Sequence, residues 1–249
     1  DKIKACEGES VIMTIRRNGQ VSSVKVLPVL NNEGNYQIGV WIRDSAQGIG
    51  TLTYIDEENE FGALGHGIND IDTTDLMEIN YGGLYETQII SIKKGESGEP
   101  GEISGVIRFV EDAREGIIKL NTVNGIYGVM DKSPKEAGVS EEELYPVALK
   151  QNIRLGDAQI LCTINGETNA YDVQITDIDY SQSEGNRGLV IQITDPVLLS
   201  QTGGIVQGMS GSPIVQDGKF IGAVTHVFVN DPTKGYGIFA ETMLHMAQE

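Results

Sequence analysis

The sequence predicts an all-β protein, and three observations carry that prediction. Short runs of alternating apolar and polar residues recur along the chain, bounded by Gly, Asn or Asp. Glycine is abundant, with 31 residues, whereas proline is sparse, with 7. A helical period is weak everywhere except near the C-terminus. Many short strands with such turns at steady spacing are typical of a β-barrel or a β-sandwich.

The first element is a hairpin. VIMTIRRNGQVSSVKVLPV holds two alternating stretches on either side of an Asn-Gly pair, which favours a tight turn. The next strands are expected at 36–44, 50–56, 60–67, 85–95, 101–110, 116–122, 125–130, 146–150, 157–166, 171–180, 188–195, 212–218 and 219–229. The polar stretch 133–146 is expected to be a connector, and Asp231-Pro232 a turn. The tail AETMLHMAQE predicts a short C-terminal helix, because Met243, Met246 and Ala247 share one helical face.

These elements divide into residues 1–28, 29–120 and 121–249. A chain of 249 residues suffices for one large all-β unit or for two smaller domains. It opens abruptly at DKIKACEGES, without an initiator Met or a signal-like start, so we expect a fragment of a longer protein. No apolar run is long enough to be a transmembrane helix.

The net charge is −18, from 36 acidic and 18 basic residues. Recognition of phosphates needs a basic face, so this charge argues against nucleic-acid binding. It indicates solubility or, alternatively, a preference for a basic partner. Cys6 and Cys162 lie far apart and form no C-x-x-C, which excludes a zinc motif and a disulfide framework. Two free, buried thiols are expected, with one long-range disulfide as the alternative.

His66 is the first candidate for chemistry. It lies in GALGHGIND, after an apolar run and between two glycines, which leave an imidazole room to reach a cleft. The alternative is a histidine that packs with a satisfied hydrogen bond. No metal site is expected, because no further His or Cys stands near enough in sequence to His66 and Asp70 to complete a ligand set.

Ser210, in GMSGSP, is the second candidate. A nucleophilic serine needs an exposed Oγ, an imidazole that takes its proton, and backbone N–H groups aimed at the oxyanion. Gly208 permits unusual dihedrals, and Gly211 removes bulk beside the attacked carbonyl. Ser212 precedes Pro213 and is better interpreted as the start of the next strand. A plain Gly/Ser/Pro-rich loop ahead of a hairpin is the alternative.

The context of both residues resembles that of chymotrypsin-like serine peptidases, in which Gly-x-Ser-Gly-x-Pro leads into a hairpin like PIVQDGKFIGAVTH. Three longer blocks, GIGTLTYIDEENEFGALGHGIND, TGGIVQGMSGSPI and GAVTHVFVNDPTKGYGIF, are similar to the sporulation serine peptidase family, the stage IV sporulation protein B-like peptidases. The resemblance covers residues 36–245. It implies a chymotrypsin-like double β-barrel, with barrels at 29–120 and 121–249 and a short C-terminal helix, preceded by a C-terminal remnant of a PDZ domain at 1–28.

The resemblance also implies residue roles. Ser210 matches the family's nucleophile and His66 its general base, while the N–H groups of Gly208 and Ser210 would form the oxyanion hole. Asp195, in QITDPVLL, matches the acid that the family is thought to use. Chymotrypsin-like enzymes generally take this acid from much earlier in the chain. Three other carboxylates therefore stay open as alternatives: Asp70, Asp112 and Asp131.

The strand after the serine hairpin is expected to bind substrate. In this fold it pairs with an extended peptide by β-augmentation, which assigns the role to Val224, Thr225, His226 and Val227. The side chain of His226 either faces the specificity pocket or packs.

The resemblance implies a serine endopeptidase that needs no metal or cofactor. Family members are extracytoplasmic and act between the mother-cell and forespore membranes. They cleave themselves and a membrane-associated regulatory protein, which leads to activation of an intramembrane protease and of a late sigma factor. A catalytically latent domain that binds and senses peptides is the alternative, since glycines at 203, 204, 208 and 211 would ease collapse of the oxyanion loop. A purely structural β-barrel is the third possibility.

Overall fold

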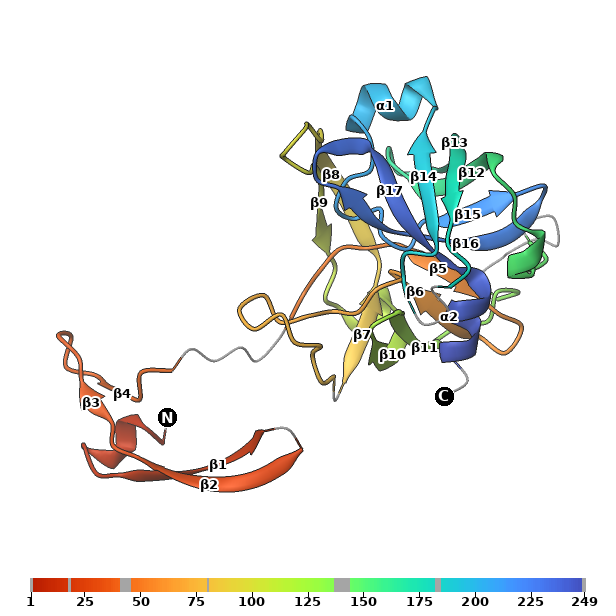
Figure 1. Cartoon of the computed structure of the whole chain (residues 1–249). Helices are drawn as coiled ribbons and strands as arrows, with labels where there is room; N and C mark the ends of the chain where they lie inside the picture. Colours follow the sequence, from red (N-terminus) through yellow and green to blue (C-terminus); the bar gives the residue numbers. More distant parts are fainter. Residues whose placement is uncertain are drawn as a thin grey trace. The chain divides into compact units, whose positions relative to one another are not determined.

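The computed structural model describes residues 2–17, 19–40, 46–79, 81–136, 144–181 and 185–247. They form two compact units, residues 1–48 and 49–249. Both are mainly β, and a short helix ends the chain, so the predicted all-β class is confirmed (Figure 1). Within the described ranges, no helix has the length and apolar character needed to cross a membrane.

The first unit contains the predicted hairpin. Strands β1 (Val11–Arg17) and β2 (Gln20–Val26) pair antiparallel along their whole length. A 3-10 turn (Lys4–Cys6) precedes them, and the short strands β3 (Val29–Leu30) and β4 (Tyr36–Gln37) follow. The strand expected at 36–44 is thus limited to two residues, and its positions 41–44 lie outside the described residues.

Both cysteines are free thiols, as expected, which removes the disulfide alternative. Cys162 is buried in the second unit, whereas Cys6 is only partly buried. The Cys6 thiol donates to the carbonyl oxygen of Ile3 at 2.8 Å.

The second unit begins with a five-stranded sheet in the order β5-β6-β11-β10-β7. Its members are β5 (Leu52–Ile55), β6 (Glu60–Ala63), β7 (Gly82–Tyr85), β10 (Arg114–Thr122) and β11 (Gly125–Met130). All neighbours are antiparallel, and the fully buried Phe61 is the centre of its apolar face. The sheet extends to Met130, beyond residue 120, at which the sequence prediction ended the first barrel.

Strands β8 (Thr87–Lys93) and β9 (Glu102–Ile107) form a separate antiparallel ribbon beside the barrel (Figure 1). Ile103 of β9 is buried and belongs to the hydrophobic core of the barrel. A 3-10 turn (Glu111–Ala113) joins the ribbon to β10.

The C-terminal half forms a closed six-stranded barrel in the order β12-β13-β14-β17-β16-β15. The strands are β12 (Gly156–Thr163), β13 (Thr168–Ile178), β14 (Leu189–Ile193), β15 (Pro213–Gln216), β16 (Lys219–Phe228) and β17 (Asp231–Phe239). Closure gives every strand of the ring a neighbour on both sides, although β15 covers β16 only as far as Ala223. Side chains such as Ile160, Ile191 and Ile214 fill the interior and are fully buried.

Helix α2 (Ala240–Met246) follows β17 and confirms the C-terminal helix. Its Met243 is fully buried against Ala223 and Ile238 of the barrel.

Three segments differ from the sequence prediction. Residues 146–150 form no strand but a single bridge, between Val147 and Phe220, ahead of a 3-10 turn (Lys150–Asn152). Asp231-Pro232 begins β17 rather than a turn, since the turn lies at 229–230 and Asp231 pairs with Phe228 of β16. An unpredicted helix, α1 (Pro196–Thr202), follows β14. Residues 137–143 of the expected connector lie outside the described residues.

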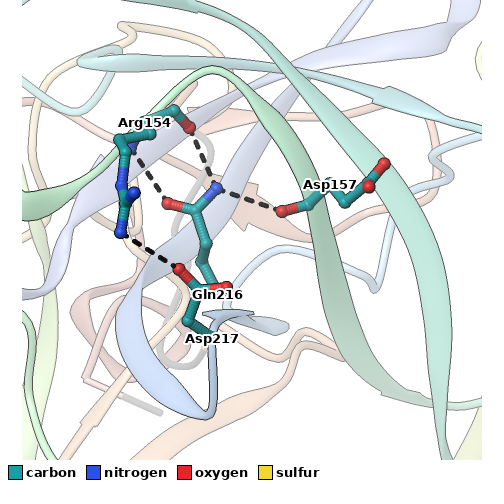
Figure 2. A network of polar contacts seen from close by, with 4 residues as sticks. All are labelled: Arg154, Asp157, Gln216 and Asp217. Carbon is teal, nitrogen blue, oxygen red and sulfur yellow. Dashed lines mark hydrogen bonds and ion pairs between the residues drawn. The ribbon is translucent and has the colours of Figure 1, made fainter.

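A buried glutamine holds the segment that enters the barrel (Figure 2). The Oε1 atom of Gln216 accepts from the N–H of Arg154 at 3.0 Å, and its Nε2 donates to the carbonyl oxygens of Arg154 at 2.9 Å and Asp157 at 3.0 Å. Beside it, an exposed ion pair joins Arg154 to Asp217 at 3.5 Å. The amide thus satisfies both backbone polar groups of Arg154 and the carbonyl of Asp157.

We expect Gln216→Leu to lower the free energy of unfolding by about 2 kcal/mol, because backbone groups would lose their partners while the apolar volume is kept. Asp217→Asn is the matched control. It removes the charge of the exposed ion pair with Arg154, keeps a side chain that tolerates the positive φ of 51° at this position, and should change stability little. Urea unfolding of the three proteins measures the difference, and equal effects of the two substitutions would contradict the structural role of Gln216.

Candidate active site

His66 lies on a tight turn directly after β6. Leu64 and Gly65 both have positive φ, of 68° and 67°, which turns the chain sharply ahead of the imidazole. A Cβ on Gly65 would lie 2.8 Å from Thr225 Cγ2, and one on Gly67 would lie 2.4 Å from the carbonyl oxygen of Thr122. Both glycines are therefore required by close packing. This is a second reason for them, in addition to the room for the imidazole ring that the sequence indicates.

The ring of His66 has a defined orientation. Its Nδ1 lies 2.9 Å from the carbonyl oxygen of Gly67. A carbonyl can only accept, so Nδ1 carries the proton and donates it, which leaves the Nε2 lone pair available as a base.

Ser210 lies in the loop between α1 and β15, the nucleophile loop (residues 203–212). Its Oγ donates to the carbonyl oxygen of Thr225 at 2.9 Å. The next residue, His226, packs against His66, with ring centroids 5.2 Å apart and a tilt of 39°. The structure thus brings Ser210, Thr225, His226 and His66 together, although within the described ranges the Ser210 hydroxyl bonds to Thr225 and not to His66.

Two N–H groups of the nucleophile loop are unoccupied. The carbonyl of Gln207 accepts from the N–H of Ile103 at 2.8 Å, and the carbonyl of Met209 accepts from the N–H of Ser212 at 2.9 Å. In a trans peptide the following N–H points the opposite way. Those N–H groups belong to Gly208 and Ser210, and among the described residues neither has a hydrogen-bond acceptor. They are the two donors that the sequence assigned to the oxyanion hole.

The expected substrate strand has a free edge beside Ser210. Pairing of β16 with β15 ends at Ala223, whereas β16 continues to Phe228 along β17. Beyond Ala223, Val224 still bonds to the nucleophile loop, through the N–H of Gly211 and the carbonyl of Ser212. Past Val224, no strand in the described part of the chain pairs with this edge of β16. Val224 and Thr225 are buried, so at these positions an added strand would contact backbone rather than side chains.

The ring of His226 is held neutral. Burial, together with the neighbouring His66 and Arg187, lowers the pKa of His226 to about 4. Its Nδ1 is buried and has no hydrogen-bond partner among the described residues. A neutral imidazole beside His66 leaves that residue free to carry a positive charge without a second one next to it.

This pKa predicts an acid-sensitive fold. An unfolded histidine titrates near pH 6.5, so between pH 6.5 and about 4 the unfolded chain binds more protons at His226 than the folded one. Stability is therefore complete above this window and falls with decreasing pH within it, by at most about 1.4 kcal/mol per pH unit. We expect His226→Phe, which does not titrate, to flatten this slope in urea unfolding at pH 7 and pH 5. Parallel pH profiles of the two proteins would refute this role of His226.

Asp195 is placed away from His66. Its Oδ1 accepts from the N–H groups of Val197 and Leu198, at 2.8 and 2.9 Å, and caps helix α1. In the register of the barrel, His226 of β16 pairs with Tyr236 of β17, which pairs with Val190 of β14. Asp195 follows five residues after Val190. At about 3.3 Å per strand residue, the separation along the barrel is roughly 16 Å. Asp195 also helps to raise the pKa of the buried Cys162 thiol to about 12, which places its charge near β12.

The alternative acids bond elsewhere too. Asp70 closes its own turn by accepting from the N–H groups of Asp72 and Thr73. Asp131 pairs with Arg114 at 2.9 Å. Asp112 is exposed in the 3-10 turn before β10. Within the described residues, His66 Nδ1 therefore bonds to a backbone carbonyl and to no carboxylate, and no group of three or more His, Cys, Asp or Glu is placed to hold a metal ion.

The cap predicts how Asp195 responds to substitution. Asp195→Ala should lower the free energy of unfolding by about 1 kcal/mol, and Asp195→Asn or Asp195→Ser should restore most of it, because these side chains also cap helices. Thermal unfolding and the rate of serine labelling are measured on the same samples. A labelling defect that Asn and Ser fail to rescue would instead favour a direct role of the Asp195 carboxylate at His66.

Thr51 was missed by the sequence reasoning. It lies just before β5, where its Oγ1 donates to the carbonyl of Gly208 at 3.0 Å and its N–H to the carbonyl of Ser210 at 2.9 Å. Its position within the GIGTLTYID block was the one sequence signal, and the two acceptors are more than 150 residues away.

A protein-family model matches most of the chain. Residues 34–244 match the family model described as SpoIVB peptidase S55. No curated protein matches the chain. Among solved structures, the active form of the Rv3671c protease from M. tuberculosis is 14% identical, over 64% of this chain and 70% of that one, with a TM-score of 0.39. The thermostable serine protease AL20 from an extremophilic microorganism is 9% identical, over 98% of this chain and 99% of that one, with a TM-score of 0.41. These low scores describe a partial likeness only.

Proposed function

Because this chain belongs to the SpoIVB peptidase S55 family and is a serine peptidase, we propose that Ser210 and His66 are its catalytic pair and that it cleaves peptide bonds through an acyl-enzyme. The carrying observation is the nucleophile loop. It presents the Ser210 hydroxyl beside two N–H groups that lack acceptors in the described part of the chain. A plain connecting loop would have no reason to keep such donors together.

In the proposed reaction, His66 Nε2 takes the proton of Ser210 Oγ as the oxygen attacks the substrate carbonyl. The N–H groups of Gly208 and Ser210 stabilise the oxyanion of the tetrahedral intermediate. His66 then returns the proton to the leaving amine. In the second half of the reaction, His66 takes a proton from water as the water attacks the acyl carbonyl, and it returns this proton to Ser210 Oγ as the acyl group leaves. The Gly67 carbonyl holds the His66 tautomer that these reaction steps require, and it partly offsets the positive charge on the His66 ring.

Substrate binding would free the nucleophile. The carbonyl of Thr225 now accepts from Ser210 Oγ, and it also lies on the free edge of β16. An extended peptide that pairs with Thr225 and Val227 would offer its own N–H to that carbonyl. The hydroxyl would then lose its partner and turn to His66. This exchange supports activation by substrate instead of permanent latency.

The finer role is proposed from family membership. We propose that the natural substrate is a membrane-associated sporulation regulator, that the chain also cleaves itself, and that both events occur between the mother-cell and forespore membranes. Signalling to an intramembrane protease and a late sigma factor belongs to the same proposal. The assignment of residues 1–28 to a PDZ remnant is supported by exposed apolar side chains on β1 and β2, such as Ile12 and Val21.

The test is covalent labelling with a fluorophosphonate, followed by mass spectrometry of the modified peptide. We expect one adduct, on Ser210 and not on Ser212, and competition by added peptide substrates. Protein heated to unfold it before labelling is the control for non-specific reaction. A folded protein that acquires no adduct, while trypsin is labelled in the same tube, would contradict the proposal and favour a latent peptide-binding domain.

A further inference from the structure

The orientation of the nucleophile loop depends on strands from outside the barrel. Ile103, on the ribbon strand β9, donates its backbone N–H to Gln207, and Gln207 donates to the carbonyl of Gly101, both at 2.8 Å. These two bonds align Gln207 in parallel with β9. The Cα of Gly208 lies so close to Ile103 that a Cβ there would be 3.0 Å from the Ile103 side chain. The peptide before Gly208 is therefore held from one side.

Thr51 holds the peptide after Gly208. Its Oγ1 bonds to the Gly208 carbonyl at 3.0 Å, while the N–H of the same peptide, from Met209, donates to Val206 at 3.1 Å. Gly208 has a φ of 102°. Because glycine has no side chain, the peptides before and after it can rotate more freely than at other residues. Bonds on both flanking peptides remove that freedom. The Gly208 N–H belongs to the peptide that Ile103 holds, and the peptide that Thr51 holds links it to the Met209–Ser210 peptide, which carries the Ser210 N–H.

Thr51 also connects the loop to His66. Its N–H donates to the carbonyl of Ser210 at 2.9 Å, and its own carbonyl accepts from the N–H of Leu64 at 3.2 Å. Leu64 begins the turn that ends at His66. Thr51 thus bonds to Ser210 and to the turn that carries His66, and its side-chain hydroxyl is the one contact among these that substitution can remove.

We propose that Thr51 is a positioning residue, whose hydroxyl fixes the Gly208–Met209 peptide and thereby the relative orientation of the two neighbouring peptides, which carry the Gly208 and Ser210 N–H groups. This inference rests on the proposed peptidase function. Thr51 contacts no reacting atom, and it acts only through Gly208 and Ser210. Without the hydroxyl, the Gly208–Met209 peptide gains freedom to rotate, and in part of the population the Gly208 and Ser210 N–H groups no longer point to the same oxyanion.

The chain offers a matched control two residues further on, in β5. Thr53 is 6% exposed, and its hydroxyl has no hydrogen-bond partner among the described residues. Thr51→Val and Thr53→Val therefore remove the same group from neighbouring positions, one bonded and one not. Thr51→Ser keeps the hydroxyl and should rescue the loss, which separates the hydrogen bond from packing of the methyl group.

In hydrolysis of a peptide ester or a labelled protein, Thr51→Val should lower kcat on the order of tenfold with little change in KM, since removal of an oxyanion donor outright costs about 100-fold or more. A peptide aldehyde, which forms a tetrahedral adduct, should bind weaker by a similar factor. Thr53→Val and Thr51→Ser should behave like wild type. Equal kcat in Thr51→Val and wild type, or a loss that Thr51→Ser fails to rescue, would overturn the inference.

A second readout does not depend on turnover. In ¹H–¹⁵N NMR spectra, the Gly208 amide should shift and exchange faster with solvent in Thr51→Val than in Thr53→Val. A wild-type protein that is not labelled in the fluorophosphonate experiment would contradict the peptidase function. The NMR signal of the Gly208 amide would still show whether Thr51 positions the peptides around Gly208. An unchanged Gly208 signal in Thr51→Val would refute the positioning role whatever the activity of the wild type.

Discussion

Replacing Ser210 by alanine is expected to abolish fluorophosphonate labelling and to lower kcat by about 10⁴- to 10⁶-fold, because no other group supplies the attacking oxygen. The folded structure should survive, since the substitution removes one hydrogen bond, to the Thr225 carbonyl. Hydrolysis of fluorescein-labelled casein and intact-protein mass spectrometry after labelling measure the two effects. Circular dichroism confirms that the variant is folded.

Ser212→Ala is the matched control. Ser212 is fully buried, its hydroxyl has no partner among the described residues, and the backbone N–H that holds the Met209 carbonyl stays in place. We expect rates within about twofold of wild type, as for a substitution that leaves the catalytic groups intact. Retained labelling in Ser210→Ala, or its loss in Ser212→Ala, would show that the wrong serine has been assigned.

Gly211→Ala should give the largest loss of stability. Gly211 has a φ of 95°, and a Cβ there would lie 2.2 Å from the carbonyl oxygen of Thr51 and 2.6 Å from the N–H of Leu64. Both neighbours are backbone atoms of the first sheet, which cannot move without displacing the turn that carries His66. Left-handed strain and overpacking together should cost more than about 3 kcal/mol, and activity should fall with it.

Gly218→Ala separates the two causes. Gly218 also has a positive φ, of 71°, but a Cβ there would meet no atom within 4 Å. It carries the backbone strain alone, which we expect to cost about 1 kcal/mol. Chemical unfolding of both variants gives the comparison. If Gly211→Ala were no more destabilising than Gly218→Ala, the contact of Gly211 with Thr51 and Leu64 would not be as tight as the structure has it.

The amino-acid sequence alone was enough to predict the all-β class, most strand positions and the two residues of the proposed catalytic pair. Alternation and turn residues are local signals, and a strand such as β13 (Thr168–Ile178) shows them within 11 residues. Helix α1 had a local signal as well, since Asp195-Pro196 is a helix cap followed by proline at the first position. That signal was assigned to catalysis instead.

The places where groups far apart in sequence meet depend on the tertiary fold. Strand β17 begins at a turn-like Asp231-Pro232 and contains two glycines, yet it forms because β14 and β16 supply hydrogen-bond partners on both sides. The hydroxyl of Thr51 bonds to Gly208 across 157 positions of sequence, and Asp195 lies at the other end of a strand from His226. Short-range patterns are encoded in neighbouring residues, whereas hydrogen bonds at the site join backbone groups whose proximity depends on closure of the whole barrel.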